Sequence, residues 1–184
     1  PTIQEAGKRA LIAGVTLRGV LEEIGRLRDE VTIPIVLMTY LNPVFRYGID
    51  AFAKECAHVG VSGLIVPDLP LEESAMVHDE FIKHDLALVQ LVSLTSPVER
   101  IERIAKASEG FLYAVTVTGI TGARAKFAAN VGEHLAKLKK VSSVPVMAGF
   151  GISTSEQVRE MGKIADGVIV GSRIVDALHA GDLD

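Results

Sequence analysis

Apolar residues along this chain fall into six short runs, separated by segments of mixed character. None of the runs alternates apolar with polar side chains, which is typical of parallel strands that are buried on both faces. We expect strands at Ile33–Thr39, Gly63–Val66, Leu86–Val92, Phe111–Thr118, Val144–Ala148 and Gly167–Val170. Apolar residues at helical spacing between these runs predict helices over Ala51–Val59 and Glu72–His84.

Two further helix starts carry the pattern of a capping box, in which a Ser or Thr side chain and a later acidic side chain cap each other's backbone. The two strings are Ser96-Pro97-Val98-Glu99 and Ser153-Thr154-Ser155-Glu156. The first also has proline at the first helical position, where its missing N–H costs nothing. We expect a helix to begin at each string.

The regular alternation of strand and helix predicts a parallel α/β fold with right-handed crossovers. The chain opens on two helical patterns, Pro1–Ala13 and Leu17–Glu30, with no strand before the first. A closed (β/α)8 barrel has eight strands over roughly 250 residues. We therefore weigh an open six-stranded sheet against a barrel whose first two strands precede Pro1, and favour an incomplete barrel forming a single partial domain over residues 1–184. The open sheet would suit a dinucleotide-binding domain, but its Gly-x-Gly-x-x-Gly turn after the first strand is missing.

Composition narrows the possible partners. The chain has a net charge of −4, and 48% of its residues are hydrophobic. The negative charge argues against a nucleic-acid-binding groove or a polybasic membrane anchor, because both need clustered Lys and Arg. No apolar run approaches the roughly 18 residues of a membrane span, so we expect a soluble protein. The single cysteine, Cys56, excludes an internal disulfide and fits a reducing, cytoplasmic compartment; its helical surroundings predict a buried side chain, not a nucleophile. The five histidines show no metal-ligand spacing, and we expect no metal.

Glycines follow the last two predicted strands, in Gly149-Phe150-Gly151 and in Gly171-Ser172. Glycine at such a point lets backbone N–H groups approach an anion, and the helix that follows adds the positive end of its dipole. Many (β/α)8 enzymes bind phosphate after their last two strands. Glycine also ends strands for steric reasons, so the pattern alone leaves both interpretations open.

Several strings at the strand ends resemble, in the same order, the α-subunit family of tryptophan synthase. They are Tyr40-x-Asn42-Pro43-Val44, the stretch from Val66-Pro67-Asp68 to Glu73, Gly119-Ile120-Thr121-Gly122, Gly149-Phe150-Gly151-Ile152-Ser153 and Gly171-Ser172. The opening Pro1-Thr2-Ile3-Gln4 matches as well, so the resemblance covers the whole chain. It implies a (β/α)8 barrel represented here by strands 3–8. It also implies retro-aldol cleavage of indole-3-glycerol phosphate to indole and glyceraldehyde 3-phosphate, with indole passing to a β subunit that carries pyridoxal phosphate; no cofactor is implied in this chain.

The resemblance also assigns roles to residues. It implies a phosphate cradle of Gly122, Gly151, Gly171 and Ser172, closed by Phe150 and Ile152, and a lid residue, Thr121. The implied apolar wall around the indole ring consists of Met38, Tyr40, Ile65, Pro67, Val92, Tyr113 and Ile169. Without the resemblance, the aliphatic members would simply be barrel core and the two tyrosines ordinary buried tyrosines.

The resemblance assigns no catalytic residue to this chain. Cleavage of the carbon–carbon bond needs general acid and base groups. The family uses a glutamate on the second barrel strand and an aspartate in the following loop, and both positions precede Pro1, so we assign no catalytic residue. Asp68 is expected to be a structural cap or a subunit contact. The alternatives are a non-catalytic fragment that binds a phosphate ligand or activates a partner, and a barrel acting on another sugar phosphate.

Overall fold

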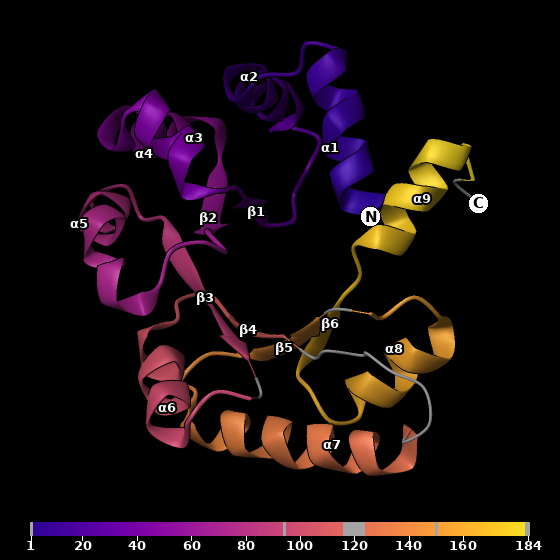
Figure 1. The fold of residues 1–184 in the computed structure, drawn as a ribbon. Coiled ribbons are helices and arrows are strands. Elements are labelled where there is room, and N and C mark those ends of the chain that lie inside the picture. Colours follow the sequence, from indigo (N-terminus) through magenta and orange to yellow (C-terminus); the bar gives the residue numbers. More distant parts are fainter. Residues whose placement is uncertain (1, 94, 116–123, 150, 183–184) are drawn as a thin grey trace. The chain divides into compact units, whose positions relative to one another are not determined.

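The computed structural model describes residues 2–93, 95–115, 124–149 and 151–182, with the side chains of residues 124–130 outside the description. Contacts divide the chain into two compact units, residues 11–90 and residues 1–10 together with 91–184. Within each unit, helices alternate with parallel strands (Figure 1). The predicted α/β alternation is therefore confirmed. No helix among the described residues is both long and apolar enough to cross a membrane.

The unit of residues 11–90 contains parallel strands that pair in chain order, β1 with β2 and β2 with β3. Its strands are β1 (Ile35–Met38), β2 (Val61–Ile65) and the start of β3 (Ala87–Ser93). Its helices are α2 (Leu17–Leu27), α3 (Leu41–Tyr47), α4 (Ile49–Val59), the short 3₁₀ helix η1 (Leu71–Glu73) and α5 (Ala75–Lys83).

The core of this unit forms where the apolar face of α4 packs on α2, α5 and β2. Phe52, Leu64 and Phe81 are all completely buried. Cys56 lies in the same cluster, as the sequence predicts, and burial raises the pKa of its thiol to about 12, with a smaller contribution from Glu55. The thiol is therefore protonated at neutral pH and behaves as a small apolar side chain.

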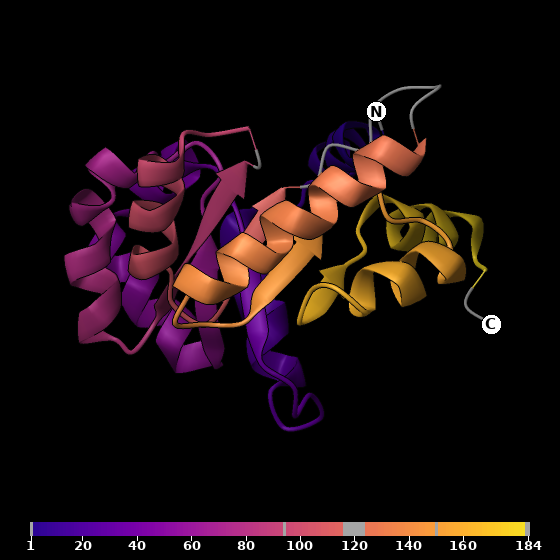
Figure 2. The same cartoon turned by 90° about the horizontal axis from the view of Figure 1, so that it is seen from below.

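The second unit contains most of α1 (Thr2–Ile12), and its strands β4, β5 and β6 pair in parallel and in chain order. The long helix α7 lies along β5, as Figure 2 shows. The elements after β3 are α6 (Val98–Ala107), β4 (Leu112–Val115), α7 (Arg124–Val141), β5 (Val146–Gly149), α8 (Ser155–Gly162), β6 (Gly167–Ile169) and α9 (Ser172–Ala180).

Some predicted boundaries are wrong. The helix predicted over Glu72–His84 begins as η1 and becomes α-helical only at Ala75, because the Ser74 hydroxyl donates to the Leu71 carbonyl (2.8 Å) and the chain forms a tight 3₁₀ turn there. Helix α3 was not predicted, since it follows β1 after only two residues and is short. Of the strand predicted over Phe111–Thr118, residues 112–115 form β4 and residues 116–118 lie outside the described part.

The helices predicted to be capped by Ser96 and Ser153 each begin one residue later than expected, and only the second has a capping box. Helix α6 begins at Val98 after Pro97, whose ψ of 148° is extended, and no side chain caps it. Helix α8 does have a capping box, but it joins Thr154 and Gln157 instead of Ser153 and Glu156. The side-chain amide oxygen of Gln157 accepts hydrogen bonds from both the Ser153 and Thr154 N–H groups (2.8 and 3.1 Å), and the helix therefore begins one residue later than predicted.

Asp166, in the turn before β6, connects three parts of the second unit. Its carboxylate accepts hydrogen bonds from the N–H of Val146 (2.9 Å) and from the Lys139 ammonium group on α7 (2.7 Å). Its own N–H donates to the Val146 carbonyl (2.9 Å). The Lys139 hydrogen bond, followed by that of Val146, holds the pKa of Asp166 below its ordinary value. The carboxylate is therefore part of the connection between β5, β6 and α7.

Removal of the Asp166 carboxylate should destabilise the second unit. We expect Asp166→Ala to lower the free energy of unfolding by about 1–3 kcal/mol, because the N–H of the fully buried Val146 loses its acceptor. Lys139→Met, which removes only a partly exposed ion pair, should cost less than about 1 kcal/mol. Urea denaturation at neutral pH measures both.

The same variants should differ in their pH dependence. Because the native pKa of Asp166 lies below its unfolded value, its stabilisation is present above the unfolded value and disappears as pH falls through the native one. The difference between wild type and Asp166→Ala should therefore shrink in acid. Equal destabilisation by Lys139→Met and Asp166→Ala would contradict the role given to the Val146 hydrogen bond.

Candidate functional site

In the unit of residues 11–90, four of the predicted wall residues lie at the carboxyl ends of neighbouring strands. Met38 ends β1 and is in register with Ile65, which ends β2. Tyr40 and Pro67 each follow two residues later in the corresponding loops. Met38 and Tyr40 are 55% and 66% exposed, whereas Ile65 is buried. Parallel pairing therefore brings these four residues to one edge of the sheet, with two large apolar side chains open to solvent.

The loops that carry these residues are held by two hydrogen bonds. The N–H of Thr39 donates to the Ile65 carbonyl (3.1 Å), and the N–H of Leu41 donates to Oδ1 of Asp68 (2.9 Å). Asp68 thus caps the N-terminus of α3 from a neighbouring loop. The expectation that Asp68 is a structural cap is confirmed, and its carboxylate is already engaged by the backbone.

In the second unit, Tyr113 on β4 explains one of the strand-end glycines. Its side chain is buried, and a Cβ atom placed on Gly149 would lie 2.5 Å from the ring and from the phenolic oxygen. Gly149 is therefore glycine because the tyrosine ring packs against its backbone. Burial raises the pKa of the Tyr113 phenol, which is accordingly neutral at physiological pH and suited to donating a hydrogen bond, not to accepting a proton.

Gly151 and Gly171, which follow the last two strands, differ in whether the structure requires glycine at their positions. Gly151 has a φ of +75°, a left-handed conformation that other residues adopt only at a cost. Gly171 has a φ of −116°, and a Cβ placed on it would meet no atom within 4 Å. Neither its backbone conformation nor its neighbours require glycine at position 171. The space beside its backbone is open.

The helices that follow these glycines also differ at their N-termini. The first N–H groups of a helix have no partner within the helix and need an acceptor. In α8 the capping box of Thr154 and Gln157 supplies one. In α9 the N-cap is Gly171, which has no side chain, and no side-chain cap is present. The N-terminus of α9, with its N–H groups and positive dipole end, is therefore the better placed of the two to bind an anion.

The remaining predicted site residues vary in their burial. Val92 on β3 is completely buried and Ile152 is 4% exposed, while Ile169 on β6 is partly buried and is in register with Gly149. Ser172 is the exposed first residue of α9. Three predictions, Thr121, Gly122 and Phe150, lie outside the described residues.

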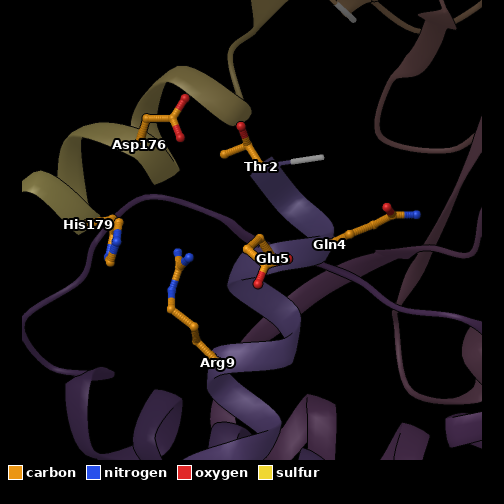
Figure 3. A pocket seen from close by; sticks show the side chains of 6 residues that line it. All are labelled: Thr2, Gln4, Glu5, Arg9, Asp176 and His179. Atoms are coloured by element: carbon orange, nitrogen blue, oxygen red, sulfur yellow. The ribbon is translucent and has the colours of Figure 1, made fainter.

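A hollow of about 420 Å³, lined by polar and charged residues, lies between α1 and α9 (Figure 3). Arg9 from α1 and His179 from α9 project into it, and no predicted site residue contributes to its lining. Two of its lining residues, Thr2 and Gln4, belong to the opening string that supports the family resemblance, but the sequence assigned no site to them. The lining residues are Thr2, Gln4, Glu5, Arg9, Asp176 and His179. Within the described part of the chain, no group of histidine, cysteine or acidic residues is arranged to hold a metal ion.

Comparison with known proteins gives a consistent result. The family model described as tryptophan synthase alpha chain matches residues 1–183. The tryptophan synthase alpha chain of Oceanobacillus iheyensis is 50% identical over 184 residues, which are 100% of this chain and 70% of that protein. The corresponding protein of Bacillus cereus is 52% identical over 179 residues, or 97% of this chain and 69% of that protein.

Solved structures agree with the sequence relatives. The tryptophan synthase subunit alpha from Campylobacter jejuni superposes with a TM-score of 0.92 at 36% identity, covering 97% of this chain and 71% of that one. The alpha chain from Legionella pneumophila gives a TM-score of 0.86 at 35% identity, covering 98% and 68%. These likenesses confirm the expected fold class, an α/β fold that matches part of a (β/α)8 barrel. The chain belongs to the tryptophan synthase alpha chain family, whose members act in tryptophan biosynthesis.

Proposed function

We propose that this chain binds indole-3-glycerol phosphate and belongs to a lyase subunit that cleaves it to indole and glyceraldehyde 3-phosphate. The observation that carries the proposal is the N-terminus of α9, where Gly171 leaves open space beside uncapped backbone N–H groups. A phosphate group is a suitable occupant, since several N–H groups and the helix dipole act on it together. Membership of the family supports the identity of the phosphate ester.

The phosphate end of the substrate is assigned to Gly171, Ser172 and Gly151. The Ser172 hydroxyl adds a donor beside the backbone N–H groups of α9, and it is exposed. Gly151 has a left-handed backbone conformation, and the residue after it, Ile152, is buried. We assign Gly122 to the same cradle, Phe150 and Ile152 to its cover and Thr121 to the lid, on the family resemblance.

The indole ring is assigned to apolar side chains at the strand ends. Met38 and Tyr40 offer exposed apolar surface that an aromatic ring can cover, and Ile65 and Pro67 adjoin them on the next strand and loop. On the family resemblance, we also assign Val92, Tyr113 and Ile169 to this wall. A mostly apolar lining with few polar contacts is what a bicyclic aromatic ligand requires. The neutral phenol of Tyr113 can serve as one of the polar contacts.

The reaction breaks a carbon–carbon bond, so it needs one group to protonate indole C3 and another to take a proton from the glycerol hydroxyl. Asp68 is unsuited to either task because its carboxylate caps α3. Tyr113 is unsuited as a base because burial raises its pKa. We therefore assign substrate binding, and no catalytic residue, to the residues of this chain. The indole product would pass to a β subunit that carries pyridoxal phosphate, and we propose that subunit as the partner.

Lyase activity is tested by incubating the chain with indole-3-glycerol phosphate, with and without a tryptophan synthase β subunit. Release of indole, or formation of tryptophan from serine when the β subunit is present, would support the enzyme. Binding of the substrate without release of indole would instead favour the non-catalytic alternative. Cleavage of a different sugar phosphate, with none of indole-3-glycerol phosphate, would overturn the proposed substrate.

Gly171→Ala should weaken phosphate binding without weakening the fold. The added Cβ meets no protein atom but occupies the space beside the N–H groups of α9, so the affinity for glycerol 3-phosphate should fall about tenfold. The melting temperature should stay the same or rise slightly, because alanine at a compatible φ lowers the entropy of the unfolded chain. Isothermal titration and thermal unfolding measure the two effects.

Gly162→Ala is the matched control for this change. Gly162 ends α8 and lies outside the proposed cradle, and a Cβ placed on it would likewise meet no atom within 4 Å. The substitution should leave the affinity for glycerol 3-phosphate unchanged. Equal affinities of wild type and Gly171→Ala would show that the phosphate does not sit at α9.

A further inference from the structure

We propose that Asp68 is a positioning residue that fixes Tyr40 and thereby the exposed part of the wall for the indole ring. The inference rests on the proposed function, because it assigns a role in recognition of the indole end of that substrate. Asp68 itself touches no reacting atom in this proposal. It acts through the backbone of the neighbouring loop.

The first observation is that hydrogen bonds flank Tyr40 on both sides. The N–H of Thr39, just before it, donates to the Ile65 carbonyl (3.1 Å), which continues the pairing of β1 with β2. The N–H of Leu41, just after it, donates to Asp68 (2.9 Å). Both acceptors belong to β2 and the loop that follows it. The backbone of Tyr40 is thus tied to the next strand at both of its neighbours.

The second observation is that α3 has no local alternative to this cap. Its N-cap is Tyr40, which makes no side-chain hydrogen bond to the helix, and its third residue is Pro43, which has no N–H. A helix of seven residues has little internal stability, so the partner of Leu41 matters for where it begins. The negative charge of Asp68 also interacts favourably with the positive end of the α3 dipole.

The third observation is that Asp68 is itself held rigidly. Leu69 donates a hydrogen bond to the Val66 carbonyl (3.1 Å), which closes a turn with Pro67 and Asp68 at its centre. Pro67 fixes its own φ, and proline is favoured at the first central position of such a turn. Val66 and Leu69, on either side, are buried in the core. The carboxylate is therefore presented to Leu41 from a fixed support.

This support matters because the side chain of Tyr40 is 66% exposed. A buried ring is placed by its packing, but an exposed ring keeps its position only as well as its backbone does. Loss of the Asp68 hydrogen bond would free one side of Tyr40 and enlarge the set of positions that its ring occupies. Binding of an indole ring there would then carry the entropic cost of ordering the loop. The phosphate end, assigned to α9, should be affected much less.

The test compares two ligands on the wild-type chain and on variants at position 68. Indole-3-glycerol phosphate carries both ends of the substrate and glycerol 3-phosphate only the phosphate end. We expect Asp68→Ala to weaken binding of indole-3-glycerol phosphate about fivefold, as measured by isothermal titration. The affinity for glycerol 3-phosphate should stay within about twofold of the wild-type value. Asp68→Asn, which keeps an acceptor oxygen for Leu41, should restore most of the affinity. The chain contains no tryptophan, so ligand indole fluorescence gives an independent reading of the same binding.

Backbone amide exchange provides a second measurement that does not depend on ligand. The Leu41 amide should exchange faster in Asp68→Ala than in wild type and Asp68→Asn. Asp79→Ala, a change at an aspartate on α5, is the matched control and should alter neither exchange at Leu41 nor affinity. If Asp68→Ala does not fold, Asp68→Glu serves instead, because it keeps the charge but displaces the carboxylate oxygens by one methylene. It should lower the affinity for indole-3-glycerol phosphate and leave the affinity for glycerol 3-phosphate unchanged.

The possible failures are distinguishable. If wild type does not bind indole-3-glycerol phosphate, the proposed function is overturned, and the positioning role with it. If wild type binds but Asp68→Ala binds equally well, only the positioning role is overturned. An equal loss for both ligands would also overturn it, because general damage to the fold would then account for the effect.

Discussion

Parallel pairing of strands is the constraint on which the candidate site depends. Parallel strands all run in the same direction, so the loops after them emerge at one edge of the sheet. In residues 11–90 this pairing aligns Met38 with Ile65, and in the second unit it aligns Gly149 with Ile169. Residues far apart in the sequence become neighbours for this reason alone. Their chemistry then depends on what each loop does with its backbone.

Backbone N–H groups at the starts of helices and strands differ in whether a side chain accepts a hydrogen bond from them. Asp68 accepts from Leu41 at the start of α3, and Asp166 accepts from Val146 at the start of β5. Both carboxylates are therefore used to hold strand and helix ends together. The N-terminus of α9 lacks such a carboxylate, and the open space at Gly171 leaves its donors accessible. A binding site for an anion can arise where the fold leaves this requirement unmet.

The strand-end glycines illustrate how far a sequence motif can be interpreted. The sequence presents Gly149, Gly151 and Gly171 as one kind of feature. In the structure, Gly149 makes room for the Tyr113 ring, Gly151 adopts a left-handed conformation, and Gly171 has neither reason. Only the third lacks an explanation within the chain. The side chain that explains Gly149 belongs to a different strand, so local sequence could not distinguish the three.

The sequence by itself determined the alternation of strands and helices apart from α3, the parallel α/β class, the burial of Cys56 and, through its ordered motifs, the family. These features depend on hydrophobic patterns and on short strings that are local in the chain. Tertiary structure decided the start of α8, the division of η1 from α5 and the use of Asp68 as a cap for α3. It also decided which strand-end glycine leaves its helix open. A helix start shifts by a residue when a nearby side chain offers a better hydrogen bond. The acceptor for the Leu41 N–H is Asp68, 27 residues further along the chain, where no local pattern can indicate it.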